Sequence, residues 1–214
     1  MTFQSLRTTP SAHKGSYMRL QRYILMAGVI VVAATTSSAA TGLPTSHISN
    51  KPTPIPGIGG PFNLIDDNGR KVSAATLAGK PSAIFFGYTF CPEVCPTTLQ
   101  DVTSWISALG SDAGKINYVF VTIDPHRDTP KVMHQYLSSF DRRIRGFSGT
   151  DEQTAKIARE YGAYYKRVPA AGGSYVMNHS DRIYLMNAQG QYVGSISYRE
   201  PDASAISKLK QLLQ

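Results

Sequence analysis

The sequence predicts an α/β domain with a central mixed sheet flanked by helices and an N-terminal hairpin. Segments typical of strands alternate with segments typical of helices from about residue 61. An Asn-Gly pair between two alternating segments signals the hairpin. The chain's two cysteines follow directly after a short apolar segment that is typical of a buried strand. Strand, helix, strand, helix in this order predicts parallel βαβ pairing.

Residues 1–40 have the pattern of an export segment. The first acidic residue of the chain is Asp66, and four basic residues precede the apolar run at 23–34. Small residues follow, with Ser38-Ala39-Ala40 as a cleavage site, which is typical of a signal peptide. Extending the apolar run through residue 40 approaches the ~20 residues of a membrane helix, so an uncleaved membrane anchor stays open. A disordered basic arm and an organelle presequence are the weaker alternatives.

The positive charge argues little about partners. The formal net charge of +8 rests on 22 basic and 14 acidic residues, and four of the basic ones lie in residues 1–40. The remainder carries only a mild excess, and no stripe of alternating basic and aromatic residues follows. We therefore expect no nucleic-acid partner.

A tether and the predicted hairpin come next. Residues 41–60 are rich in proline and glycine, which favours an extended tether. We expect one domain over residues 61–214. It begins with a hairpin at 61–72, where apolar and polar residues alternate around Asn68-Gly69.

The cysteines lie between a strand and a helix. Residues 83–87 are β-branched, aromatic or small and predict the strand. Pro96 suits the first position of a helix that ends at Gly110. Cys91 to Cys95 is therefore expected to be a loop that caps this helix.

The rest of the chain completes the fold. The patterns predict a strand at 115–124, a helix at 130–140 with Asp128 or Thr129 as its cap, and a helix at 151–161 with Thr150 as its cap. They then predict loop through Gly172-Gly173, a hairpin at 183–197 and a closing amphipathic helix. This order is the thioredoxin arrangement, in which the cysteines would lie at the carboxyl ends of the strands.

Two sulfurs at a helix N-terminus can form a disulfide, exchange with other disulfides or bind a thiophilic metal. A purely structural disulfide explains little, because closing a five-residue loop constrains the unfolded chain weakly. The five histidines each have an ordinary structural explanation. His13 and His47 lie in the leader and tether, His134 on a helix, His126 in a loop and His179 before the last hairpin.

Three motifs resemble the Sco/SenC family of copper chaperones, over nearly all of residues 60–214. Residues 86–96 look like its Cys-Pro-x-x-Cys-Pro signature. Residues 122–130 are similar to its Asp-Pro-x-Arg-Asp-Thr loop, and residues 179–187 match its His-x-x-x-x-Tyr-Leu pattern. Three separated motifs in the right order make the resemblance specific.

The resemblance implies a thioredoxin-like fold that binds copper through Cys91, Cys95 and His179. It also implies that the copper goes to the copper-site subunit of cytochrome c oxidase, which holds a binuclear copper centre. Two thiolates and an imidazole suit Cu(I) and tolerate Cu(II). We expect export to a bacterial periplasm, soluble or anchored to the inner membrane, in preference to the mitochondrial inner membrane. A thiol reductant and a copper donor are the further partners expected.

Two positions depart from the family pattern, and other functions stay open. Asn178 stands where some relatives have an acidic residue, and His126 where many have glutamate. We expect Asp124 and Asp128 to serve helix capping and turn geometry. The main alternative function is a thiol-disulfide oxidoreductase that uses Cys91 and Cys95 as a redox pair, so enzyme activity is left undecided. A peroxide reductase and an inert domain with a structural disulfide rank lower.

Overall fold

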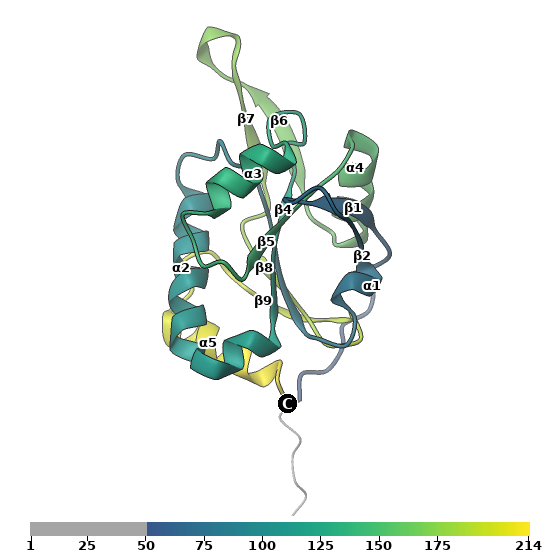
Figure 1. The fold of residues 1–214 in the computed structure, drawn as a ribbon, viewed down its shortest axis with the longest axis vertical. Helices are drawn as coiled ribbons and strands as arrows, with labels where there is room; N and C mark the ends of the chain where they lie inside the picture. Colours follow the sequence, from purple (N-terminus) through teal and green to yellow (C-terminus); the bar gives the residue numbers. More distant parts are fainter. Residues whose placement is uncertain (1–50) are drawn as a thin grey trace, which may run out of the picture. The chain divides into compact units, whose positions relative to one another are not determined.

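A mixed sheet forms the centre of the domain in the computed structural model, which describes residues 51–214 (Figure 1). Within these residues the sheet has seven strands in the order β2-β1-β5-β4-β3-β8-β9. The strands are β1 (Asn63–Asp66), β2 (Lys71–Ser73), β3 (Ser82–Gly87), β4 (Asn117–Thr122), β5 (Ile144–Ser148), β8 (Ile183–Met186) and β9 (Tyr192–Ile196). Strands β3, β4 and β5 are parallel, and β1 and β8 run antiparallel to their neighbours.

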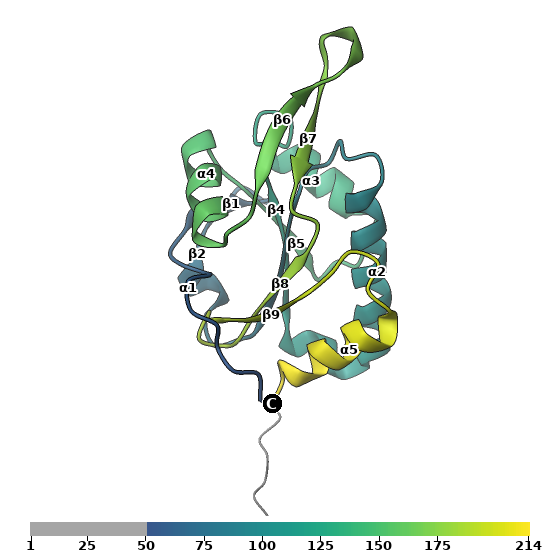
Figure 2. The same ribbon diagram turned by 180° about the vertical axis from the view of Figure 1, so that it is seen from behind.

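Helices cover both faces of the sheet. They are α1 (Ala74–Leu77), α2 (Val94–Leu109), α3 (Pro130–Leu137), α4 (Asp151–Glu160) and α5 (Asp202–Gln211), with a 3-10 turn η1 at Gly110–Lys115. Helices α2, α3 and α5 lie on one face, and α1 and α4 lie on the other (Figures 1 and 2). The predicted thioredoxin-like α/β fold is confirmed.

The centre of the core is strand β3, all six residues of which are buried. Phe86 has no exposed surface, and its ring packs against Tyr161 and Tyr184 at centroid distances of 5.7 and 5.5 Å. A strand with helices on both faces buries consecutive side chains on opposite sides, which explains an unbroken apolar run.

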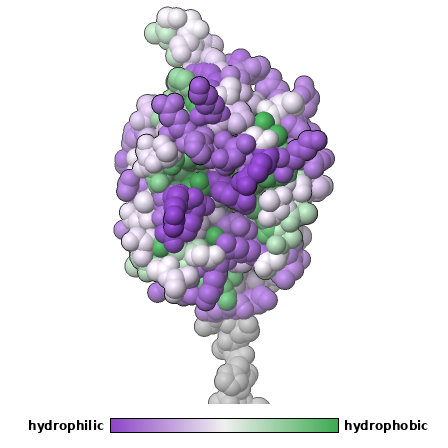
Figure 3. Space-filling view, viewed as in Figure 1, coloured by the Kyte–Doolittle hydropathy of each residue, from purple (hydrophilic) through white to green (hydrophobic). Residues whose placement is uncertain are grey.

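The outer surface is mostly hydrophilic on the face shown in Figure 3.

The predicted hairpins and helix caps agree with the structure. Strands β1 and β2 form the N-terminal hairpin, and β8 and β9 form the last one. Thr129 caps α3 by accepting a hydrogen bond from the Val132 N–H. Thr150 and Gln153 form a capping box at α4.

The start of α2 differs from the prediction by two residues. Glu93 occupies the N-cap position and Val94 begins the helix, so Cys95 lies in its first turn while Cys91 stays in the preceding loop. Pro96 is the third helical residue. This position tolerates proline because the first N–H groups of a helix have no intrahelical acceptor.

Strand β5 was not predicted from the sequence. Its residues include Arg145 and Gly146, which interrupt any apolar pattern. The strand forms because β4 pairs with it over four residues. Gly146 also allows α3 to pack closely against β5, since a Cβ at this position would lie 2.8 Å from Leu137 Cδ1.

A second small sheet replaces the predicted loop. Strands β6 (Tyr165–Pro169) and β7 (Tyr175–His179) pair with each other. They project beyond the body of the domain (Figures 1 and 2). Gly172 and Gly173, both with positive φ, make the turn between them. Most β6 side chains are exposed, so the segment lacks the alternation of apolar and polar residues that predicts a strand.

The end of the predicted tether contacts the domain. The N–H groups of Ile55 and Gly59 donate to Tyr192 O and Glu160 O, both at 2.7 Å. The predicted export segment, and the tether as far as residue 50, lie outside the described residues, and the domain boundary at residue 61 remains a prediction. Between residues 51 and 214, no helix has the length and apolar character that crossing a membrane requires.

We expect Phe86→Ala to lower the free energy of unfolding by about 3–5 kcal/mol, because it leaves a cavity between aromatic rings. Urea denaturation measures the change. Tyr164→Ala is the matched control, since 55% of Tyr164 is exposed and its loss should cost less than about 0.5 kcal/mol. Equal losses for the two variants would contradict this account of the core.

Candidate metal centre

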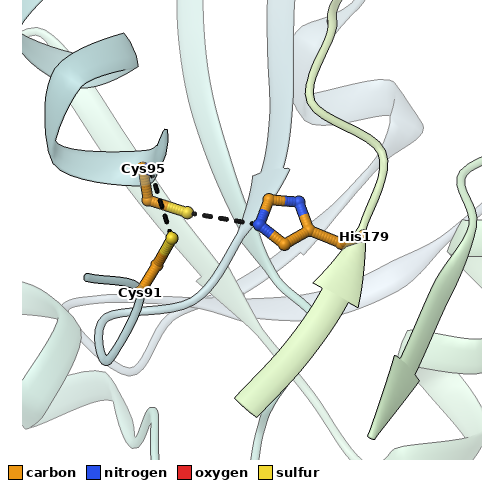
Figure 4. Close-up of side chains that lie close together, drawn as sticks. All are labelled: Cys91, Cys95 and His179. Carbon is orange, nitrogen blue, oxygen red and sulfur yellow. Dashed lines mark hydrogen bonds between the residues drawn. The ribbon is translucent and has the colours of Figure 1, made fainter. Parts of the chain in front are cut away.

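Cys91, Cys95 and His179 come together at one end of the sheet (Figure 4). Their potential ligand atoms all lie within 4.8 Å of one another. Cys95 Sγ is 3.6 Å from His179 Nε2, and the Cys95 backbone N–H donates to Cys91 Sγ at 3.4 Å. The three residues predicted to form the site are therefore neighbours.

Each ligand candidate comes from a different element. Cys91 lies in the loop after β3, Cys95 in the first turn of α2, and His179 is the last residue of β7. Successive side chains of a strand point to opposite faces. Met177 and His179 therefore share the face of β7 that is turned toward the domain, whereas Val176 and Asn178 are exposed.

The imidazole of His179 presents one free nitrogen to the sulfurs. Its Nδ1 lies 2.7 Å from the backbone oxygen of Ser180, which can only accept a hydrogen bond. Nδ1 must therefore carry the proton in the neutral ring, which leaves the lone pair of Nε2 facing Cys95 Sγ. The rings of Phe85 and Tyr88 hold the imidazole edge-on at centroid distances of 6.2 and 5.7 Å.

The two cysteines differ in environment and in acidity. Both are free thiols, Cys95 fully buried and Cys91 partly exposed. A hydrogen bond from the Cys95 thiol is the largest cause that lowers the pKa of Cys91, to about 4, against the opposing effect of burial. Burial raises the pKa of Cys95 above its usual value. The pair therefore holds one proton, with the negative charge on Cys91.

A buried carboxylate supports the cysteine loop. Asp128 accepts hydrogen bonds from the Thr89 N–H at 2.9 Å, the Thr89 hydroxyl at 2.6 Å and the Thr122 hydroxyl at 2.7 Å. Burial raises the pKa of Asp128. Asp128 does not cap α3, a role that Thr129 fills, but the predicted turn is present, since the Asp128 N–H donates to the backbone oxygen of Asp124 at 3.0 Å. The Asp128 side chain also bonds the end of β4 to the loop before Cys91, which was not predicted.

Asp124 forms the predicted turn, because its backbone oxygen accepts from the N–H groups of Arg127 and Asp128. Its side chain has a further role that was not predicted. Its carboxylate forms an ion pair with Arg127 and accepts a hydrogen bond from the Tyr175 hydroxyl at 2.8 Å. The motif at residues 122–130 contains Arg127 but predicts no role for it, and no sequence pattern points to Tyr175. The signal that could have found the role of Arg127 is the pair of acidic residues directly after β4, at the edge of the sheet where the cysteines also lie.

The two other histidines in the part of the chain that the structure describes do not join the site. The imidazole of His126 is 2.8 Å from Asp151, and that of His134 is 3.3 Å from Asp67, in both cases with exposed histidine side chains. His13 and His47 lie outside the described residues.

An open cavity gives access to the site. Its volume is about 550 Å³, and residues of the cysteine loop and of β7 line it, among them Cys91, Pro92, Val176 and His179. A partner or ligand can thus approach Cys91 and His179 from solvent, whereas Cys95 is buried and does not line the cavity.

We expect Cys91 to react with iodoacetamide at a nearly constant rate between pH 6 and 8, because its pKa of about 4 keeps it a thiolate there. The rate should fall only at more acidic pH. Mass spectrometry after timed alkylation measures the rate at each cysteine.

Cys95→Ala is the matched control for this experiment. It removes the hydrogen bond that contributes most to the low pKa of Cys91, so the alkylation rate should regain a rise with pH. A steep rise between pH 6 and 8 in the unmodified chain would contradict the charge assignment.

Comparison with known proteins places this chain in a family. The SCO1/SenC family model matches residues 50–214. The mitochondrial protein SCO2 of Saccharomyces cerevisiae is 36% identical over 160 residues, which cover 73% of this chain and 53% of that protein. The SCO2-like protein RP587 of Rickettsia prowazekii is 36% identical over 138 residues, covering 64% of this chain and 67% of that protein.

A solved structure of Bradyrhizobium japonicum ScoI with copper bound is also similar. It is 45% identical, with a TM-score of 0.69, over 72% of this chain and 99% of the other. The chain spans about half the length of the curated yeast relative that it matches. Relatives thus occur in mitochondria and in bacteria. The family model covers more than half of the residues, and this chain therefore belongs to the SCO1/SenC family.

Proposed function

We propose that this chain is a copper chaperone that binds copper through Cys91, Cys95 and His179 and delivers it to cytochrome c oxidase. The observation that carries the proposal is the convergence of two sulfurs and one imidazole nitrogen within 4.8 Å. The copper is a cargo, so the site must accept it and release it.

The chemistry of these ligands favours copper over zinc. Thiolate sulfur selects Cu(I), and an imidazole nitrogen makes Cu(II) acceptable as well. Structural zinc sites normally have four protein ligands. Among residues 51–214, the potential cluster of cysteine, histidine and acidic residues contains these three side chains. A three-ligand site leaves a coordination position through which copper can pass to a partner.

The acidity of the pair supports capture of a metal ion. Cys91 is a thiolate at neutral pH, while Cys95 keeps its proton until the metal displaces it. The exposed, charged sulfur would therefore make the first bond, and the buried thiol would close the site. Release would proceed in the reverse order through the open cavity beside Cys91.

Copper bound to ScoI of Bradyrhizobium japonicum supports the choice of metal. The recipient, the copper-site subunit of cytochrome c oxidase, follows from the resemblance stated above. We further propose that the chain acts after export, in a bacterial periplasm, with residues 1–40 as signal peptide or membrane anchor. In that oxidising environment a thiol reductant must keep Cys91 and Cys95 reduced before a copper donor loads them.

The second candidate function is thiol-disulfide exchange, and the asymmetry of the cysteines favours it. An accessible thiolate beside a buried thiol is the arrangement in which the first attacks a partner's disulfide and the second resolves the mixed disulfide. Electrons would pass from the pair to the partner, leaving Cys91 and Cys95 joined as a disulfide. Both activities use the same reduced pair and can belong to one protein.

We expect the reduced chain to bind one copper ion, and we expect each substitution of a ligand candidate to weaken this binding. Cys91→Ser and Cys95→Ser should each weaken Cu(I) binding by more than about 100-fold. This is more than the loss of a residue that only hydrogen-bonds to a metal ligand would cost. His179→Ala should abolish the thiolate-to-Cu(II) absorption band. Anaerobic titration against a competing chelator, followed by optical spectra, measures both.

His134→Ala is the matched control, because this exposed histidine lies on α3 and belongs to a pair with Asp67. It should bind copper as the unmodified chain does. Unchanged copper affinity and an unchanged spectrum in His179→Ala would exclude the three-ligand site.

Insulin reduction separates the two functions. If copper delivery is the main activity, the metal-free chain should reduce insulin slowly compared with thioredoxin, and stoichiometric Cu(I) should suppress the remaining turnover because it occupies both sulfurs. Turbidity of the precipitating insulin chain reports the rate. Fast turnover by a chain that fails to retain copper would favour the oxidoreductase.

A further inference from the structure

An arginine beside the metal centre contacts both of the segments that carry the ligand candidates. The Arg127 guanidinium lies 3.8 Å from the centroid of the Tyr175 ring, and its Nη1 donates to the Tyr175 backbone oxygen at 3.0 Å. The same group is 4.8 Å from the ring of Phe90, the residue directly before Cys91. Arg127 therefore lies between the cysteine loop and the start of β7.

Asp124 fixes the arginine and the tyrosine together. This carboxylate is buried, pairs with Arg127 Nε and accepts the Tyr175 hydroxyl at 2.8 Å. Tyr175 is thus bonded at its hydroxyl by Asp124 and at its backbone by Arg127. We call these three residues, Asp124, Arg127 and Tyr175, the arginine network.

The arginine network matters for His179 because of where β7 lies. Strands β6 and β7 form a sheet separate from the central one, so no ladder of strand hydrogen bonds fixes β7 to β3 or β8. Side-chain contacts must hold it instead. Tyr175 and His179 are four residues apart on one strand and therefore share a face, so an anchor at the first orients the second.

The burial of Arg127 is costly for the fold. One of its buried nitrogens, Nη2, has no hydrogen-bond acceptor among the described residues. Only 19% of its side chain is exposed, and its partner carboxylate is fully buried. A buried ion pair of this kind contributes little net stability, because desolvation offsets the attraction. Orientation of a neighbouring group is a reason to retain it.

We propose that Arg127 is a positioning residue that, through Tyr175, holds His179 at the distance from the sulfurs that copper requires. This inference rests on the copper site proposed above. Loss of the arginine network would let the imidazole move, whereas the cysteine loop keeps its hydrogen bonds to Asp128 and Cys95 its place in α2. Cu(I) is satisfied by two thiolates, whereas Cu(II) depends on the nitrogen ligand. The arginine network thus sets the affinity for Cu(II) and leaves that for Cu(I) nearly unchanged.

The test uses two conservative variants of the full chain. Tyr175→Phe keeps the ring but removes the hydroxyl that Asp124 accepts. Arg127→Lys keeps the charge but lacks the planar group that stacks on Tyr175 and bonds two partners at once. Each should weaken Cu(II) binding by about tenfold, the effect typical of losing a residue that supports a metal ligand without binding the metal. Each should also reduce the nitrogen splitting in the electron paramagnetic resonance spectrum, with Cu(I) affinity unchanged.

Arg199→Lys is the matched control. Arg199 pairs with Glu93 in the cysteine loop at 2.9 Å, from the loop after β9, and is not a member of the arginine network. Its variant should keep the Cu(II) affinity and spectrum of the unmodified chain. Circular dichroism and thermal unfolding confirm that every variant is folded.

A double-mutant cycle distinguishes positioning from general loosening. If Arg127 acts through the imidazole, Tyr175→Phe should weaken Cu(II) binding in the unmodified chain but not in His179→Ala. Additive losses, or equal losses of Cu(I) and Cu(II) affinity, would overturn the inference. If the unmodified chain binds no copper, or binds it without His179, the proposed function itself fails. A normal His179-dependent spectrum in both conservative variants overturns the positioning role alone.

Discussion

The complete burial of strand β3 is the constraint on which the site depends. Helices cover both of its faces, and its residues from Ser82 to Gly87 have almost no exposed surface. A strand held this firmly delivers the next residues to one place at the edge of the sheet. The position of β3 therefore fixes where the cysteine loop and the first turn of α2 lie. The chemistry therefore rests on a rigid part of the core.

Two buried carboxylates extend this rigidity to the ligand-bearing segments. Asp128 bonds the loop before Cys91 to the end of β4, and Asp124 connects the same region to β7 through Tyr175. Both aspartates are almost fully buried, and both have several hydrogen-bond donors. Buried polar groups with satisfied partners specify one arrangement because each alternative leaves a charge or a donor unpaired. The position of the site thus depends both on the apolar core around β3 and on the hydrogen bonds of the two buried aspartates.

The site has an asymmetry that suits transfer of a soft metal. One sulfur is charged and partly exposed, the other is protonated and buried, and the imidazole nitrogen faces both. A metal can bind in steps from the exposed side, and a partner can remove it by the same route. The same asymmetry suits disulfide exchange, so the two candidate functions would use one pair of cysteines.

The sequence by itself determined the α/β class, the strand before Cys91, the caps at Thr129 and Thr150 and, through its three motifs, the family and the ligand candidates. These features depend on local residue patterns, which a linear chain records directly. Only the tertiary structure decided that β5 and the β6–β7 hairpin are strands, since pairing partners rather than apolar alternation stabilise them. It also decided the roles of Asp124, Arg127 and Asp128. Their effect on the cysteine loop and on β7 arises from contacts with residues 39 to 51 positions away, which no local sequence pattern predicts.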